Sequence, residues 1–146
     1  MSRQPTSLLF DLFVAGQQAR TLLSRVMGPA PLRPDQYAVY SAVLEFGPVT
    51  PTELARLLGM PLTTLLEYTH PMEHLKHARR LVNARDQRSY LLELTASGRE
   101  VHRRTNAVFE VASAALLARL EIPELEARQT LRAIAKAAAA ANEAVG

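Results

Sequence analysis

Residues 50–69 read TPTELARLLGMPLTTLLEYT, a stretch that predicts two short helices separated by a tight turn. Thr50 and Glu53 can bind the free backbone amides at the start of a helix, and the proline after Thr50 suits its first turn. Gly59 can take the left-handed conformation that ends a helix, and a second helical pattern begins at Leu62. The side chains expected to face the core are Leu54, Leu57, Leu58, Leu65, Tyr68 and Met72. Two helices joined in this way are typical of a helix-turn-helix.

Further helical patterns lie on both sides of this motif. Apolar side chains recur at spacings of three and four, the period of a helix with one apolar face. The predicted helices cover residues 7–27, 34–46, 97–120 and 124–142. A capping box at residues 97–100 (SGRE) predicts the start of the third of these. The alanine run at 137–141 favours a helix that another helix can approach closely, and a frayed tail is the alternative.

The sequence period changes from helical to alternating after residue 76. Residues 77–81 and 88–94 predict two strands, and residues 82–87 between them predict a hairpin loop. A hairpin that follows a helix-turn-helix is a wing. The predicted fold class is therefore mainly α with a small β-hairpin wing, a winged helix-turn-helix.

Composition limits the class of protein. A chain of 146 residues with 48% hydrophobic residues can bury one ordinary core, so we expect a single domain over 1–146. The absence of cysteine excludes disulfides, thiolate metal sites and cysteine nucleophiles. No apolar run approaches the roughly 18 residues of a membrane span, and the first residues lack the pattern of a secretion signal. We therefore expect a cytoplasmic protein without a membrane partner.

Positive charge is concentrated in one segment. The chain carries a formal net charge of +3, whereas residues 76–104 contain eight basic and three acidic side chains, a net charge of +5. Arginines clustered in this way suit the phosphate groups of a polyanion. A solvated surface is the alternative explanation of such a charge run, so charge alone does not decide between the two.

The order of these elements resembles the MarR family of bacterial transcription regulators over nearly the whole chain. The resemblance is carried by residues 52–59 (TELARLLG) and by residues 86–99 (DQRSYLLELTASGR), which match the family's wing and the start of its next helix. It implies a homodimer whose first and last helices interlock, with each recognition helix in a major groove of double-stranded DNA and each wing in the adjacent minor groove. Residues 1–31 and 97–146 are then dimerisation helices, and residues 32–96 are the DNA-binding lobe.

Four charged residues of the predicted wing are candidate DNA contacts. The resemblance places Arg88 at the family's wing arginine, and Asp86 can orient its guanidinium for a narrow minor groove. A salt bridge that only stabilises the hairpin is the alternative. Arg85 at the tip and Arg80 near the end of the first strand are the next candidates for phosphate contacts.

The predicted recognition helix carries few groups that suit DNA. Thr63 and Thr64 can donate to phosphate or place a methyl group against thymine, and helix capping is the alternative role. Glu67 can accept a hydrogen bond from cytosine, and a repulsive filter or a solvated carboxylate is the alternative. No lysine or arginine lies within residues 62–75. Pro71 is expected to displace the residue before it from helical geometry.

The end of this helix combines a departure from the family pattern with a set of histidines. Lys76 stands where the family has a helix-ending glycine. His70, His74 and His77 have a spacing that can place imidazoles on one helix face, where they can bind a metal. Polar or phosphate-facing histidines are the alternative. We expect no metal and no cofactor, because a metal site also needs a fourth ligand and supporting hydrogen bonds.

These observations favour a sequence-specific DNA-binding regulator, and we expect a homodimeric repressor that a small ligand releases from DNA. Tyr37 and Tyr40 are candidate ligand contacts, and core packing is their alternative role. No arrangement of residues typical of catalysis is present, so we expect that the protein is not an enzyme. The alternative function is a winged-helix protein-interaction module that has lost sequence-specific DNA binding, which the acidic, proline-containing recognition helix favours.

Overall fold

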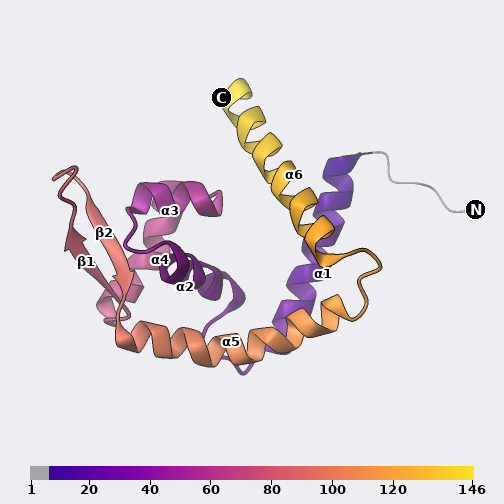
Figure 1. Ribbon diagram of the computed structural model, residues 1–146, viewed down its shortest axis with the longest axis horizontal. Helices are drawn as coiled ribbons and strands as arrows, with labels where there is room; N and C mark the ends of the chain where they lie inside the picture. The colour runs from indigo at the N-terminus through magenta and orange to yellow at the C-terminus, as the bar shows by residue number, and fades with distance from the viewer. Residues whose placement is uncertain (1–6) are drawn as a thin grey trace, which may run out of the picture. The chain divides into compact units, whose positions relative to one another are not determined.

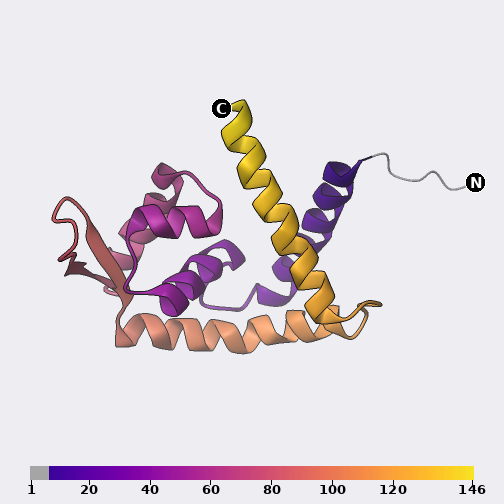
Figure 2. The same cartoon turned by 45° about the horizontal axis from the view of Figure 1, so that its top comes forward.

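The computed structural model describes residues 7–146, which form six helices and one two-stranded hairpin (Figure 1). The elements are α1 (Leu8–Met27), α2 (Pro34–Phe46), α3 (Pro51–Leu58), α4 (Leu62–His74), β1 (Ala78–Val82), β2 (Tyr90–Leu94), α5 (Ala96–Leu117) and α6 (Glu124–Val145). They divide into two compact units, up to Ala112 and from Ser113 onward. In Figures 1 and 2 the hairpin lies at one edge of the first unit, beside α3 and α4. The predicted winged helix-turn-helix is confirmed.

The turn between α3 and α4 has the predicted geometry. The Thr50 hydroxyl accepts a hydrogen bond from the Glu53 backbone amide at 3.1 Å, and Gly59 adopts a φ of 67°. The expected disruption by Pro71 was wrong, because α4 includes His70 and continues to His74. Proline has no amide hydrogen to donate, but its carbonyl still accepts the amide of Leu75 at 2.9 Å, and the helix continues through it.

Lys76, just after the end of α4, adopts a left-handed conformation. Its φ is 62°, and it is the non-glycine residue with positive φ in the described part of the chain. Its backbone amide donates to the Glu73 carbonyl at 3.0 Å, and the amide of His77 donates to the Met72 carbonyl at 2.8 Å. These bonds close the last turn. The conformation explains why a glycine suits this position better than a residue with a Cβ atom.

The wing is an antiparallel hairpin in which β1 is shifted by one residue from the prediction and β2 is two residues shorter than predicted. Arg80 pairs with Leu92 in its register, and Leu92 also exchanges backbone hydrogen bonds of 3.0 and 2.8 Å with Val49, which adds a single bridge on the other side. Residue 88 belongs to the loop and not to β2, because Asp86 binds its backbone amide and thereby holds a turn.

The capping residue of α5 lies two positions before the predicted one. Thr95, and not Ser97, caps the helix, because its hydroxyl accepts the amide of Gly98 at 3.1 Å. The same hydroxyl donates to the Lys76 carbonyl at 2.6 Å. A Cβ atom on Gly98 would collide with the carbonyl oxygen of His77, so glycine permits this close approach. The first turn of α5 is thus fastened to the end of the recognition helix.

The core of the first unit is built around α2, which contacts α1, α3, α4 and β2. Its most deeply buried side chains include Val39, Val43, Leu54, Leu65 and Leu92. The expectation that Leu57 faces the core was wrong: it is 53% exposed, because the buried face of the short helix α3 is occupied by Leu54 and its neighbour Ala55.

The second unit consists of residues 113–146 and contains α6. The alanine run is helical, and α6 continues beyond it to Val145. No residue of α6 is buried. Leu125 and Leu131 are 62% and 54% exposed. Within residues 7–146, no helix is both long and apolar enough to cross a membrane.

Candidate nucleic-acid interface

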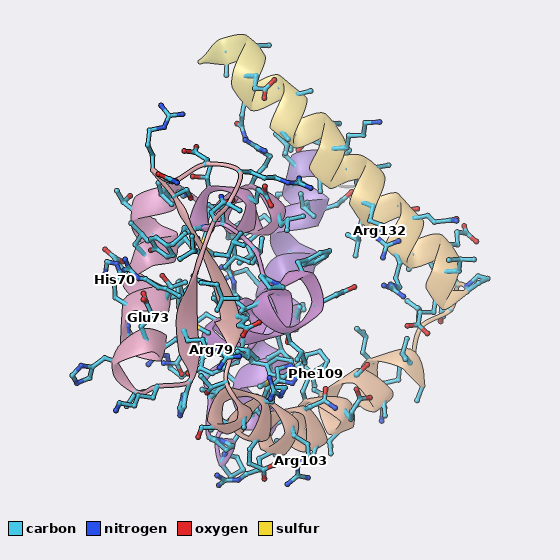
Figure 3. The ribbon with its side chains drawn as sticks, turned by 60° about the vertical axis from the view of Figure 1, so that its left-hand side comes forward. His70, Glu73, Arg79, Arg103, Phe109 and Arg132 are labelled. Atoms are coloured by element: carbon cyan, nitrogen blue, oxygen red, sulfur yellow. The ribbon has the colours of Figure 1, made fainter. Side chains whose placement is uncertain are left out.

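One face of α4 is directed outward. Thr63, Glu67, His70 and His74 follow one another at helical spacing, and all four are exposed, whereas Leu65, Thr69 and Met72 on the opposite face are buried. Figure 3 shows His70 at the outer side of α4. We call these four residues the outward strip. It contains the polar side chains that α4 exposes, and its two histidines are those for which the sequence offered a metal site or a polar, phosphate-facing role.

The predicted contacts on α4 separate into two groups. Thr63 and Glu67 are exposed and belong to the outward strip, while Thr64 is half-buried. Thr64 and Glu67 both line a cavity described below. Neither threonine caps the helix, because its first residue follows Pro61 and no side chain binds the free amides there. Within residues 7–146, the carboxylate of Glu67 has no hydrogen-bond or ion-pair partner, so it adds an uncompensated negative charge to this face.

The wing tip presents an oriented arginine. Asp86 accepts hydrogen bonds through one carboxylate oxygen from Nε of Arg88 at 3.1 Å and from its backbone amide at 3.0 Å. The Arg88 side chain is nevertheless 92% exposed. Hydrogen bonding by the Arg88 side chain holds the pKa of Asp86 below its ordinary value. The backbone of Arg85 is fixed by the side chain of Asn83 at 3.1 Å, and its own side chain is exposed.

Arg80 has a different environment from the arginines at the wing tip. Its Nε and Nη2 atoms lie 2.5 and 3.4 Å from the two carboxylate oxygens of Glu73 on α4. Its guanidinium also stacks on the ring of Tyr90, 3.8 Å from the ring centre. Hydrogen bonding to Glu73 raises the pKa of Arg80 above its ordinary value. The neighbouring Arg79 pairs instead with Glu93 across the hairpin.

A cavity of about 530 Å³ lies between α2, α4 and the segment before α2. Its apolar walls include Val39 and Met72, and its polar lining includes Tyr40, Glu67 and His77. The Tyr40 hydroxyl and Nδ1 of His77 are 2.7 Å apart. Both candidate ligand contacts are buried in the core, but only Tyr40 lines this cavity.

Tyr37 lies instead in a polar cluster between α2 and α5. Its ring stacks on His102 at 4.8 Å, and its hydroxyl donates to the side chain of Asn106. Nε2 of His102 is 2.8 Å from the Ser41 hydroxyl. Burial lowers the pKa of His102. The sequence holds no signal for this cluster, since Ser41 and His102 are 61 residues apart.

The histidines after residue 69 do not converge. His77 turns inward to Tyr40, while His70 and His74 are exposed on α4. Within the described residues, no group of three or more histidine, cysteine or acidic side chains is arranged to hold a metal ion.

A helix-turn-helix, an exposed recognition helix and an adjacent basic hairpin define this chain as a winged helix-turn-helix protein. The chain is similar to the M. tuberculosis transcriptional regulator MOSR in complex with DNA, with a TM-score of 0.77 and 23% identity over 93% of this chain and 98% of that chain. It is similar to apo MarR from E. coli, with a TM-score of 0.71 and 22% identity over 88% of this chain and 96% of that chain.

A third similar structure is the PcaV transcriptional regulator from Streptomyces coelicolor in complex with its natural ligand. Its TM-score is 0.70, with 24% identity over 95% of this chain and 99% of that chain. No protein-family model matches the sequence, and no curated protein sequence matches it. The expected fold is confirmed by the structural likeness: this chain has the fold of the MarR regulators.

Proposed function

We propose that the chain is a sequence-specific, DNA-binding transcription regulator and not an enzyme. The observation that carries the proposal is the Arg88 side chain, which is 92% exposed at the wing tip while Asp86 orients its guanidinium. An arginine presented in this way suits a narrow minor groove. The outward strip of α4 then faces the adjacent major groove. The likeness to MOSR, whose structure contains DNA, supports this assignment.

The regulator acts as a homodimer formed by residues 1–31 and 97–146, with residues 32–96 as the DNA-binding lobe. In support, α1 exposes Leu9 and Phe13 to 74% and 65%, and α6 exposes Leu125 and Leu131. Large apolar side chains exposed in this way are characteristic of an interface. Two lobes related by a twofold axis read half-sites about 34 Å apart.

A small ligand that enters the cavity beside Tyr40 releases the repressor from DNA. The cavity lies against α4, so a ligand that fills it contacts the recognition helix directly through Met72 and Thr64. Its volume of about 530 Å³ suits a small molecule. The likeness to PcaV, whose structure contains its natural ligand, supports an effector of this kind.

The alternative is a protein-interaction module without sequence-specific DNA binding. The outward strip favours it, because that strip holds the uncompensated Glu67 carboxylate and lacks lysine and arginine. A negative charge on this face weakens the attraction to phosphates.

Titration with duplex DNA at increasing salt separates the two functions. Fragments of the source genome that the protein retains are the appropriate duplexes. A DNA-binding regulator retains binding at about 150 mM salt, and its affinity falls with a log-log slope near −0.9 for each phosphate contacted. Binding that disappears at about 150 mM salt for every fragment contradicts the proposal and supports the interaction module.

A further inference from the structure

Glu73, Arg80 and Tyr90 join the recognition helix to both strands of the wing. Glu73 lies in the last turn of α4, Arg80 in β1 and Tyr90 in β2. In the strand register Arg80 faces Leu92, so Tyr90 is its diagonal neighbour on the same face of the hairpin. We call these three residues the wing strut. Figure 3 shows Glu73 on α4 beside the hairpin.

The contacts of the strut restrict the Arg80 guanidinium on two sides. Glu73 accepts hydrogen bonds from Nε at 2.5 Å and from Nη2 at 3.4 Å, and the Tyr90 ring covers one face at 3.8 Å. The Glu73 side chain is only 19% exposed. A forked contact of this kind fixes direction as well as distance.

The strut adds a side-chain connection to the backbone contacts that hold the hairpin, which include the hydrogen bonds between Val49 and Leu92. Only residues 75–77 link α4 to β1, and Lys76 among them has a positive φ. The hydrogen bond between Glu73 and Arg80 joins a residue before this link to a residue after it. The Val49–Leu92 bridge holds β2 to the segment before α3, whereas the Glu73–Arg80 contact ties β1 to α4 itself and so limits the direction of the hairpin relative to that helix.

From these contacts we infer that Arg80 and Glu73 are positioning residues, which hold α4 and the wing at the spacing needed to enter two adjacent grooves together. This rests on the proposed function. Arg80 therefore contributes to DNA binding through Glu73, and not through a phosphate as its charge and place in the sequence suggested.

The variant Glu73→Gln distinguishes between two roles of Arg80, contact with phosphate and positioning of the wing, because the two roles predict different changes in DNA affinity. If Arg80 only contacts phosphate, loss of a nearby negative charge leaves binding unchanged or tighter. If the strut positions the wing, Glu73→Gln weakens binding about tenfold, because the fork is lost. Arg80→Lys retains the charge but not the fork or the stacking, so it weakens binding similarly. The salt dependence of binding stays that of the parent in both variants.

Two matched controls accompany these variants. Glu93→Gln makes the same charge change, but on β2 instead of α4. Glu93 pairs with Arg79 across the hairpin and has no hydrogen bond or ion pair with α4, so this variant binds as the parent does or more tightly. Tyr90→Phe keeps the ring under Arg80 and binds like the parent, whereas Tyr90→Leu removes the ring face and binds more weakly. Thermal melting confirms that each variant is folded, and the tyrosine pair tests the strut even if Glu73→Gln does not fold.

Shortening the DNA distinguishes positioning from a general loss of structure. Removing the base pairs that flank the half-sites takes away the wing contact, which weakens parent binding about tenfold. In Glu73→Gln the wing no longer docks with α4, so the same truncation costs less than about threefold. If the parent binds no duplex, both the proposed function and this inference fail. If the parent binds and Glu73→Gln binds equally well, or loses as much on truncation, this inference alone is overturned.

Discussion

Nε of Arg88 lies 3.1 Å from Oδ1 of Asp86, and the same oxygen accepts the Arg88 backbone amide at 3.0 Å. The carboxylate therefore fixes both the turn and the direction of the side chain. Arg88→Ala is expected to shift the melting temperature by less than about 2 °C, since the side chain is solvated. It weakens binding to a retained DNA fragment by about 10-fold to about 100-fold. Thermal melting and DNA titration measure both effects.

Asp86→Ala serves as the matched variant of the same contact. It leaves the charge of Arg88 in place, so the loss of DNA affinity is smaller than for Arg88→Ala. Preference for A·T-rich flanks relaxes, because a free guanidinium no longer favours the narrow groove. A large fall in melting temperature with unchanged DNA affinity for Arg88→Ala shows that the pair only stabilises the hairpin.

Lys76→Gly is expected to stabilise the protein. Lys76 has a φ of 62°, a conformation that is unfavourable for a residue with a Cβ atom, so glycine relieves strain in the folded chain. Glycine also has more conformational freedom in the unfolded chain, which offsets part of this gain. The net effect is an increase of about 0.5 to 1 kcal/mol in the free energy of unfolding. Chemical denaturation measures it. Gly59→Ala, at a φ of 67°, is the control and lowers the same quantity by about 1 kcal/mol. Destabilisation by Lys76→Gly would show that contacts of the lysine side chain outweigh the backbone strain.

The dimer is tested on the exposed face of α1. Light scattering of the parent should give about twice 16.1 kDa. Leu9→Glu combined with Phe13→Glu places charges on side chains that are 74% and 65% exposed, and we expect loss of the dimer as monomer or aggregate. Leu57→Glu, on α3 and 53% exposed, is the matched change and leaves the dimer intact. A double variant that remains a dimer contradicts the role of α1.

We expect the stability of the fold to decrease as the pH is lowered from about 7.5 to about 5.5, because His102 then gains a proton. Burial lowers the pKa of this imidazole below the 6.5 of an ordinary histidine. The unfolded chain therefore binds more protons in this range, and the contribution of neutral His102 is complete above the unfolded pKa and is lost as the pH falls. His102→Gln can keep a polar contact with Ser41 but does not titrate. We expect a smaller drop in its melting temperature than in that of the parent, and equal drops would assign the effect to other groups.

Local interactions made much of this protein predictable from its sequence. The Thr50 cap, the left-handed Gly59 and the contact of Asp86 with Arg88 each join residues at most three positions apart, or concern a single residue. Such interactions depend on residue type and spacing, which a sequence displays directly. The winged helix-turn-helix follows from them. The errors at Pro71 and Ser97 concern a single backbone hydrogen bond and a shift of two residues in the position of a helix cap.

The tertiary structure alone decided which distant side chains meet. Tyr40 contacts His77, Ser41 contacts His102, and Arg80 stacks on Tyr90 while it binds Glu73. Helical and strand periodicity predicts the face on which a residue lies but not the partner that packs against that face. Partner choice depends on how the helices and the hairpin pack, and hence on the shape of the whole core. For this reason the sequence indicated a basic wing, whereas only the packing of α4 against β1 and β2 revealed that one of its arginines connects the wing to the recognition helix.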